Sequence, residues 1–322
     1  MRHRMRAKPN TMQPRTLMMI TEAAVRRLNP LAVIAAIETA FRDRYLTAVI
    51  PARTHITTND GILLIMPCYD PTRGTLGMKL VTVLRAPARP EDRIQATYLL
   101  LDPVSGQPRL QVAANYLTDL RTAATSAAAT KLLARPDAST LGIFGTGRQA
   151  RAHIEIVSLV RKFTRILVCG TDAAKVRDLV NQMPAELQVE EADAKTCVAS
   201  SDVICTCTTS PTPLFDGNLI KPGTHLNVVG AFQPRTREVD DVTVQRSRVV
   251  VDTYTAALDE AGDILIPLNK GLITREHIWA DLHELLSGKK AVRTNAEEVT
   301  LFKSVGIAIE DLATAELIQV DS

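Results

Sequence analysis

A glycine-rich loop at residues 145–150, Gly-Thr-Gly-Arg-Gln-Ala, constrains the fold of this chain more than any other segment. A short apolar run at 140–144 precedes it, as in a buried parallel strand, and apolar residues at helical spacing follow it. In this G-x-G-x-x-A pattern, Gly145 permits a tight turn, Gly147 lets the backbone approach a pyrophosphate, and Ala150 lets the helix pack on the strand. The flanking strand and helix favour a dinucleotide-binding loop over a glycine turn that only connects two elements. We therefore expect phosphate contacts from Gly145, Thr146, Gly147, Arg148 and Gln149.

Strand-like and helix-like segments alternate after this loop. Apolar runs at 166–169, 203–207, 225–230 and 248–252 are typical of buried strands, and residues 173–182 have the pattern of a helix. Such alternation predicts a parallel sheet with right-handed crossovers, as in a Rossmann domain. We expect residues 301–317 to close the chain as a helix.

The segment before the loop has a different pattern. Strands are predicted at 17–20, 62–66, 77–83 and 96–101, and the last three are separated by turn sequences that favour a mostly antiparallel sheet. Asn29-Pro30 is typical of a helix start, and a long helix at 117–134 carries a face of small residues that permits close packing. The predicted fold class is therefore α/β, with a Rossmann dinucleotide-binding domain and a smaller α/β domain.

Composition excludes several classes of function. The 38 basic and 35 acidic residues among 322 leave a net charge of +3, and there is one Trp, so we expect no nucleic-acid partner. No apolar run reaches the roughly 18 residues of a membrane span, so we expect no membrane partner. Five scattered cysteines without metal-ligand spacing predict reduced thiols in the cytoplasm and no metal site.

The first sixteen residues are basic and lack a following hydrophobic segment, which argues against a secretory signal. We expect residues 1–16 to be a flexible basic tail, or sequence upstream of a start at Met12 or Met18, rather than an organelle presequence.

Residues after the second strand of the parallel sheet bear on cofactor choice. An NAD-selective site usually places an acidic residue there, where it binds the ribose hydroxyls. Here Gly170 and Thr171 leave room for a 2′-phosphate and Lys175 could neutralise it, whereas Asp172 suits free hydroxyls. We expect NADPH or NADH, with a slight preference for NADPH.

Over residues 17–317 the chain resembles the ornithine cyclodeaminase/mu-crystallin family. The matching phrases, in order, are Pro-Ala-Arg-Thr-His (51–55), Gly-Met-Lys-Leu-Val (77–81), Leu-Arg-Thr-Ala-Ala (120–124), the loop at 145, Val-Gly-Ala-Phe (229–232), Glu-Ala-Gly-Asp (260–263) and Lys-Ser-Val-Gly (303–306). The resemblance implies a homodimer whose substrate-binding and dimerisation domain comes from both chain ends (17–121 and 302–322), with a Rossmann domain at 122–301.

The resemblance also implies site residues. Arg53, Lys79 and Arg121 look like the family's clamp for a substrate carboxylate, and guanidinium and ammonium groups suit a small anionic substrate. Each has an ordinary alternative as a surface cation, least so Lys79, which interrupts an apolar strand and would be costly to bury unpaired. We expect Lys79 and Glu260 to be the catalytic residues, with Asp263 as another candidate acid, although both acids could be structural. We expect further cofactor contacts from Thr122, Cys207, Thr208, Val229, Val305 and Gly306.

Phe232 departs from the family pattern. Cyclodeaminases and alanine dehydrogenases of the family carry an acid–base Asp at the position where this chain has Phe232. A phenyl ring cannot transfer a proton, whereas reduction of a preformed iminium needs only hydride. We therefore expect NAD(P)H-dependent reduction of a cyclic imino acid, Δ1-pyrroline-2-carboxylate or Δ1-piperideine-2-carboxylate, with Phe232 against the ring. The alternatives are an amino-acid dehydrogenase or ornithine cyclodeaminase, and a mu-crystallin-like NADP-dependent ligand-binding protein.

Overall fold

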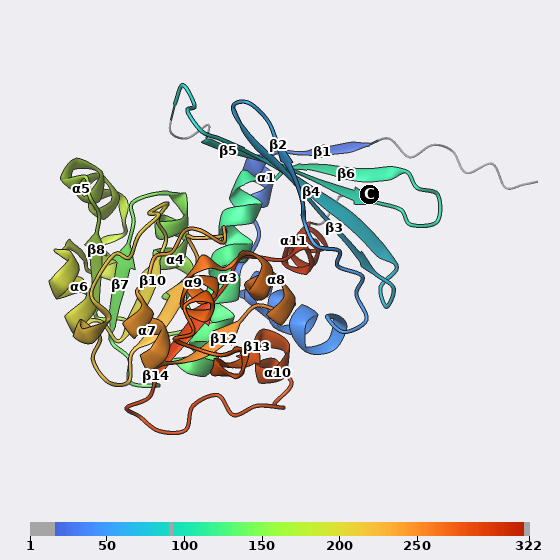
Figure 1. Cartoon of the computed structure of the whole chain (residues 1–322). Coiled ribbons are helices and arrows are strands. Elements are labelled where there is room, and N and C mark those ends of the chain that lie inside the picture. The colour runs from blue at the N-terminus through green and yellow to red at the C-terminus, as the bar shows by residue number, and fades with distance from the viewer. Residues whose placement is uncertain (1–16, 90–92, 319–322) are drawn as a thin grey trace, which may run out of the picture.

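The chain forms two sheets, joined by helices, in a computed structural model that describes residues 17–89 and 93–318 (Figure 1). The predicted tail at 1–16 lies outside the described residues, as do 319–322. The predicted α/β fold with a Rossmann-type domain is confirmed. No helix in the described part of the chain is long and apolar enough to cross a membrane.

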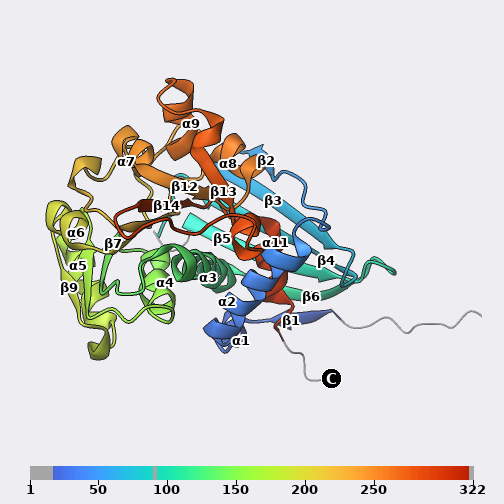
Figure 2. The same ribbon diagram turned by 90° about the horizontal axis from the view of Figure 1, so that it is seen from below.

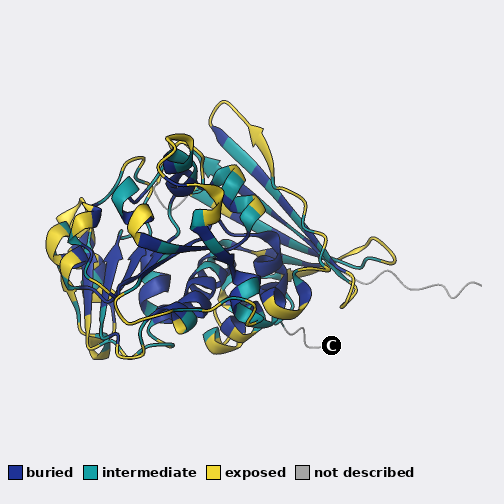
Figure 3. Ribbon diagram, turned by 60° about the horizontal axis from the view of Figure 1, so that its bottom comes forward, coloured by how far each residue is buried: buried dark blue, intermediate teal, exposed yellow. Residues whose placement is uncertain are grey.

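The first sheet is six-stranded, in the order β1-β6-β5-β4-β3-β2. Its strands are β1 (Met18–Ile20), β2 (Thr54–Thr57), β3 (Gly61–Asp70), β4 (Thr75–Leu84), β5 (Ile94–Leu101) and β6 (Pro108–Ala113). Only the β1–β6 pair is parallel, so the prediction of a mostly antiparallel sheet is confirmed. Buried and partly exposed residues alternate along β3 and β5, because one face packs on helices and the other does not. Figure 3 shows this alternation.

The second sheet is parallel throughout and has eight strands, in the order β13-β12-β14-β11-β10-β7-β8-β9. They are β7 (Thr140–Phe144), β8 (Arg165–Cys169), β9 (Val189–Glu191), β10 (Val203–Thr206), β11 (His225–Val228), β12 (Ser247–Val251), β13 (Ile278–Asp281) and β14 (Val299–Lys303). The strand order reverses direction between β7 and β10, which is where an open parallel sheet forms its ligand crevice.

Hydrophobic cores cover both faces of the parallel sheet. Within β12, Val249 and Val251 belong to one core and Val250 to the other, since successive side chains point to opposite faces. Figure 2 shows α3 and α4 below the sheet and α7 and α9 above it. Strands that are buried on both faces have continuous apolar sequences, which is why these strands could be predicted from the sequence.

The helix start at Asn29-Pro30 and the helix at 173–182 lie where the sequence predicts them. The helices are α1 (Glu22–Val25), α2 (Pro30–Thr39), α3 (Asn115–Leu133), α4 (Arg148–Val157), α5 (Ala173–Gln182), α6 (Ala194–Ser200), α7 (Asp241–Arg246), α8 (Tyr254–Glu260), α9 (Gly262–Asn269), α10 (Leu282–Leu286) and α11 (Ala308–Ala315). Asn29 caps α2 by accepting a hydrogen bond from the Leu31 amide at 2.9 Å. The small-residue helix α3 packs against α4 on one side and against α2 and α11 on the other, so it joins the two halves.

The prediction of one closing helix over 301–317 is wrong. Residues 299–303 form β14 between β11 and β12, and the chain then crosses to the first sheet, where α11 packs on β3 and β4. Lys303, inside the predicted helix, is instead on β14, where it is fully buried and its Nζ lies 2.9 Å from Asp263. The predicted domain boundaries, after 121 and after 301, fall inside α3 and β14, and the division into domains stays a prediction.

Candidate active site

The glycine loop follows β7 at the point where the strand order reverses. Gly145 has a φ of 117°, and a Cβ atom there would lie 2.6 Å from the carbonyl oxygen of Cys207, so only glycine fits. Gly147 is the N-cap residue of α4, and no side chain among the described residues caps this helix. Its first amides are thus available to a phosphate. These features fit the pyrophosphate of a dinucleotide.

Asp119 of α3 holds two side chains of this loop. Its Oδ2 lies 3.0 Å from Nε of Arg148, and its Oδ1 accepts a 3.0 Å hydrogen bond from Gln149. Burial raises the pKa of Asp119 to about 6, and Arg148 opposes that shift. Sequence reasoning missed Asp119, although a carboxylate among the small residues of α3 was a visible signal.

The residues expected to contact the adenosine ribose lie together after β8. Gly170 packs closely under the loop, since a Cβ there would be 2.9 Å from Cγ2 of Thr146. Asp172 caps α5 by accepting hydrogen bonds from the amides of Ala174 and Lys175, and Nζ of Lys175 lies 3.7 Å from its carboxylate. Gly170, Thr171, Asp172 and Lys175 are exposed, so a ribose could reach them.

The buried carboxylate of Glu238 joins the ends of β10 and β11. It accepts hydrogen bonds from the Thr206 hydroxyl, from the amide and hydroxyl of Thr208, and from the Gly230 amide, each at 2.7 Å. Its own amide donates to Asp263, at 2.7 Å. Asp263 thus holds the backbone at Glu238, which fits the structural alternative, and Glu238 fixes the loops that carry Cys207, Thr208 and Val229.

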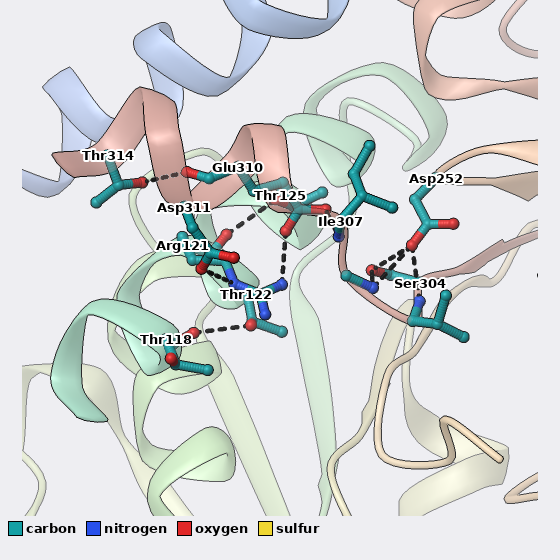
Figure 4. Close-up of polar contacts among 12 residues, drawn as sticks. Thr118, Arg121, Thr122, Thr125, Asp252, Ser304, Ile307, Glu310, Asp311 and Thr314 are labelled. Carbon is teal, nitrogen blue, oxygen red and sulfur yellow. Dashed lines mark hydrogen bonds and ion pairs between the residues drawn. The ribbon is translucent and has the colours of Figure 1, made fainter. Parts of the chain in front are cut away.

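A second buried carboxylate, Asp252 at the end of β12, shapes the segment after β14. Its Oδ2 accepts hydrogen bonds from the Ser304 hydroxyl at 3.2 Å and from the amides of Val305 and Gly306 at 2.7 and 2.8 Å (Figure 4). This segment runs from the parallel sheet to α11. It therefore lies between the dinucleotide loop and the first sheet.

Two of the three predicted clamp cations share one carboxylate of α11. Nζ of Lys79 donates to Oδ1 of Asp311 at 2.8 Å. Nε of Arg121 donates to the same oxygen at 3.1 Å, and Nη1 of Arg121 donates to Glu310 at 2.7 Å (Figure 4). Lys79 is buried and paired, as its place in an apolar strand predicted, and it is no surface cation. Neither acidic partner was identified from the sequence, because both lie far along the chain from the cations that they bind.

The third cation, Arg53, reaches the same segment from the other side. Its Nη2 donates to the carbonyl oxygens of Val305 and Gly306 at 2.9 and 2.5 Å, and its Nε lies 3.0 Å from Oε1 of Glu260. Nε2 of His55 lies 3.3 Å from the same oxygen. Arg53, Lys79 and Arg121 thus converge around Gly306 and Asp311.

Burial and neighbouring charges shift the pKa values of the ionisable groups in this cluster. Burial and the neighbouring Arg121 lower the pKa of Lys79 to about 8, against the effect of Asp311. Burial opposes charge on Arg121, yet Asp311 and Glu310 raise its pKa. Burial also raises the pKa of Glu260, which Arg53 and His55 counteract. The cations of the cluster are therefore matched by carboxylates before any anion binds.

A cavity of about 130 Å³ opens beside Arg53 and Glu260. Gly306, Met66 and Thr253 are among its other lining residues. It is smaller than the roughly 300 Å³ at which ordinary ligand pockets begin, so it suits a small molecule. Lys79 and Arg121 do not line it, and neither does Phe232, which packs against both cores. Thr122 is half-buried on α3, one residue from Arg121, with its hydroxyl bonded to Thr118 at 2.7 Å.

The crevice therefore brings a dinucleotide loop and a cationic cluster to the same edge of the parallel sheet. The described residues contain no group of three metal-ligating side chains. The arrangement can bind a dinucleotide along the strand ends and a small anion near Gly306, where the two halves of the chain meet.

The sequence and the fold are similar to those of known proteins. A profile of the ornithine cyclodeaminase/mu-crystallin family matches residues 15–321. Δ1-Pyrroline-2-carboxylate reductase of Bacillus thuringiensis is 36% identical over 263 residues, 79% of each chain, and ketimine reductase mu-crystallin of Mus musculus is 35% identical over 271 residues, 83% of each. The solved structure of Thermococcus litoralis Δ1-pyrroline-2-carboxylate reductase with NADH and L-proline superposes with a TM-score of 0.89 at 35% identity, covering 94% of this chain and 96% of that one.

Proposed function

Because this chain belongs to the ornithine cyclodeaminase/mu-crystallin family, we propose that it reduces a cyclic imino acid to an L-amino acid with a nicotinamide cofactor. The substrates are Δ1-pyrroline-2-carboxylate, which gives L-proline, and Δ1-piperideine-2-carboxylate, which gives L-pipecolate. The enzyme is an oxidoreductase acting on a C=N bond.

One observation carries this proposal: Arg53 and Arg121 meet at Gly306, between β14 and α11, and Lys79 shares the carboxylate of Asp311 with Arg121. A small anion offers little area for apolar contact, so charge-assisted hydrogen bonds must supply both affinity and orientation. Arg53 lines the cavity, and a protein that bound only an apolar ligand there would have no use for its charge. Phe232 favours reduction of a preformed imine over deamination, because a phenyl ring cannot remove a proton from an amino group.

The side chains of the cluster have distinct parts in the reaction. When bound, a reduced nicotinamide supplies a hydride to an electrophilic carbon. Arg53, Lys79 and Arg121 hold the substrate carboxylate and so fix the orientation of the C=N bond. Asp311 and Glu310 hold two of these cations in place before the substrate arrives, which reduces the ordering needed on binding.

The finer cofactor choice is also a proposal. We favour NADPH over NADH, because Lys175 in the first turn of α5 is exposed, as Gly170 and Thr171 are, and its ammonium group suits a 2′-phosphate. Asp172 is engaged by two backbone amides as the cap of α5, which leaves it less able to select free hydroxyls.

We further propose a homodimer formed by the outer face of the six-stranded sheet. The side chains of Leu63, Leu80 and Leu99 line a groove on this face and are only partly covered. A partly covered apolar sheet face is a typical association surface. The cytoplasmic location predicted from the five cysteines, which are free thiols, stays a prediction.

Initial rates of NAD(P)H oxidation with each imine and each cofactor test the function directly. We expect turnover to L-proline or L-pipecolate without ammonia release, and a loss of about 100-fold in kcat/KM in Arg53→Ala, because a charge-assisted hydrogen bond contributes roughly 1.5–3 kcal/mol. Arg165→Ala, an exposed arginine at the start of β8, is the matched control. Ammonia release from alanine or ornithine would indicate a dehydrogenase or cyclodeaminase. Tight NADPH binding without turnover would indicate a ligand-binding protein.

A further inference from the structure

The acid Glu260 connects the small cavity with solvent through His55. Glu260 is the last residue of α8 and lines the cavity beside Arg53. Its Oε1 lies 3.0 Å from Nε of Arg53 and 3.3 Å from Nε2 of His55, whereas its Oε2 is buried and has no hydrogen-bond partner among the described residues. The carboxyl group therefore has one engaged oxygen and one free oxygen.

His55 occupies the solvent side of this contact. It lies on β2, the edge strand of the first sheet, where every residue is exposed, and 37% of its side chain is accessible. It is not among the residues that line the cavity. An imidazole in this position can take a proton from water on one side and pass it to Glu260 on the other.

We propose that Glu260 donates the proton that the substrate nitrogen needs and that His55 replaces this proton from solvent. This inference rests on the proposed imine reduction and extends it. A free iminium can accept a hydride directly, but above the pKa of the iminium the dissolved imine is neutral and is a poor hydride acceptor. A proton donor in the site would keep the reaction running there.

The proton and electron balance is complete. The carboxylic acid of Glu260 protonates the imine nitrogen and becomes a carboxylate. Hydride addition from the reduced nicotinamide then forms the new C–H bond, and the π electron pair of C=N moves to nitrogen. The substrate is reduced and the nicotinamide is oxidised, while Glu260 regains its proton from His55, and His55 takes one from water.

Other charged groups around Glu260 set its proton affinity. Arg53 and His55 face it from the segment around β2, Asp252 acts on it from the end of β12, and Asp259 precedes it on α8 and lines the same cavity. Burial and Asp252 favour the protonated acid, whereas Arg53 and His55 favour the carboxylate. These opposed influences suit a group that must both give up and regain a proton.

The first test is the pH profile of kcat at saturating Δ1-pyrroline-2-carboxylate, because kcat reports the ionisations of the bound complex, in which Glu260 and the imine nitrogen share the proton. We expect the wild-type enzyme to keep its rate above the pKa of the iminium. In Glu260→Gln and His55→Gln the rate should instead follow the protonated fraction of the bound imine and fall about tenfold per pH unit. Added imidazole should restore His55→Gln but not Glu260→Gln. Asp137→Asn, which alters an exposed carboxylate just after α3 that does not line this cavity, should keep the wild-type profile.

A binding measurement distinguishes loss of proton transfer by Glu260 from a general disruption of the site in the variants. L-Proline has a ring nitrogen that can donate to Glu260, whereas cyclopentanecarboxylate has only the carboxylate. Calorimetry should show that Glu260→Gln lowers the affinity for L-proline about tenfold relative to cyclopentanecarboxylate, and that His55→Gln leaves this ratio unchanged. Unchanged pH profiles in both variants would overturn the relay. A wild-type protein that reduces no imine even at acidic pH would instead overturn the proposed function.

Discussion

Gly306 lies so close to the guanidinium of Arg121 that a Cβ atom added at Gly306 would stand 2.2 Å from Nη1. The φ of Gly306 is 76°, a conformation that other residues rarely adopt. Asp252 holds this backbone through the Gly306 amide, and Arg53 donates to its carbonyl oxygen. The absence of a side chain at Gly306 is thus what allows two clamp cations to meet.

The first prediction follows from this contact. Gly306→Ala should displace Arg121 and lower kcat/KM for the imine about 100-fold, since small misplacements in a site have effects of this size. Gly74→Ala is the matched control, because Gly74 also has a positive φ, 59°, but a Cβ there meets nothing within 4 Å. It should cost about 1–2 kcal/mol of stability and leave kcat/KM unchanged. Equal kinetic losses in both variants would contradict the contact with Arg121.

A second prediction concerns pH and Lys79. The pKa of Lys79 is lowered to about 8, from an ordinary value of 10.5, so its charge is present below pH 8 and is lost above it. The affinity for cyclopentanecarboxylate, which has no ring nitrogen, should therefore weaken as the pH rises through 8. Lys79→Arg should keep its charge and remove this dependence. An affinity that stays constant to pH 10 in the wild type would show that Lys79 does not contribute charge to the site.

The same shift has a consequence for stability. Between about pH 8 and 10.5 the unfolded chain holds a proton on Lys79 that the folded chain has lost, so this residue makes folding more favourable as the pH rises through that window. Denaturant unfolding of the wild type and Lys79→Met across this range measures the contribution. As the pH rises through this range, the free energy of unfolding of the wild type should increase relative to that of Lys79→Met.

A third prediction concerns Asp119, which holds Arg148 and Gln149. Asp119→Ala leaves both side chains of the dinucleotide loop without their partner. The KM for the cofactor should rise about tenfold, given roughly 1.5–3 kcal/mol for hydrogen bonds to a charged group, while the KM for the imine changes little. Asp137→Ala, at an exposed carboxylate just after α3, should change neither constant.

Cofactor selectivity gives a fourth prediction. Lys175→Ala should lower kcat/KM for NADPH about tenfold and leave that for NADH unchanged, because only NADPH carries the 2′-phosphate. Lys195→Ala removes an exposed lysine from α6 and serves as the control. An equal effect on both cofactors would argue against a contact between Lys175 and the 2′-phosphate.

A fifth prediction addresses the dimer. Leu80→Glu places a charge on the outer face of the six-stranded sheet and should convert the dimer to a monomer in analytical ultracentrifugation. Val104→Glu changes a side chain that is 95% exposed in the turn after β5 and should leave the mass unchanged. A dimer that survives Leu80→Glu would point to another interface.

Local patterns in the sequence predicted much of this architecture. The dinucleotide loop, the cap at Asn29 and the helix at 173–182 depend on residues close in the chain, and each was found where the structure has it. The strand at 299–303 was missed because Leu301-Phe302-Lys303 suits a helix as well as a strand. The burial of Lys303 in this strand depends on its ion pair with Asp263, forty residues earlier in the chain.

In the candidate site, too, contacts between residues distant in sequence could not be predicted. The family resemblance pointed to Arg53, Lys79 and Arg121, but not to the carboxylates that hold them. Asp311 lies 232 residues from Lys79 in sequence, and no local pattern connects the two. Glu238 and Asp252 were likewise missed, because their role depends on strand ends that meet only in the folded sheet.

The most direct test of the central claim compares Δ1-pyrroline-2-carboxylate with Δ1-pyrroline, which has the same ring and imine but no carboxylate. If buried cations bind the anion, the wild-type enzyme should prefer the carboxylate by a factor on the order of 100 or more in kcat/KM, and Arg53→Ala should lose most of that preference. Similar rates with the two imines in the wild-type enzyme would contradict the account.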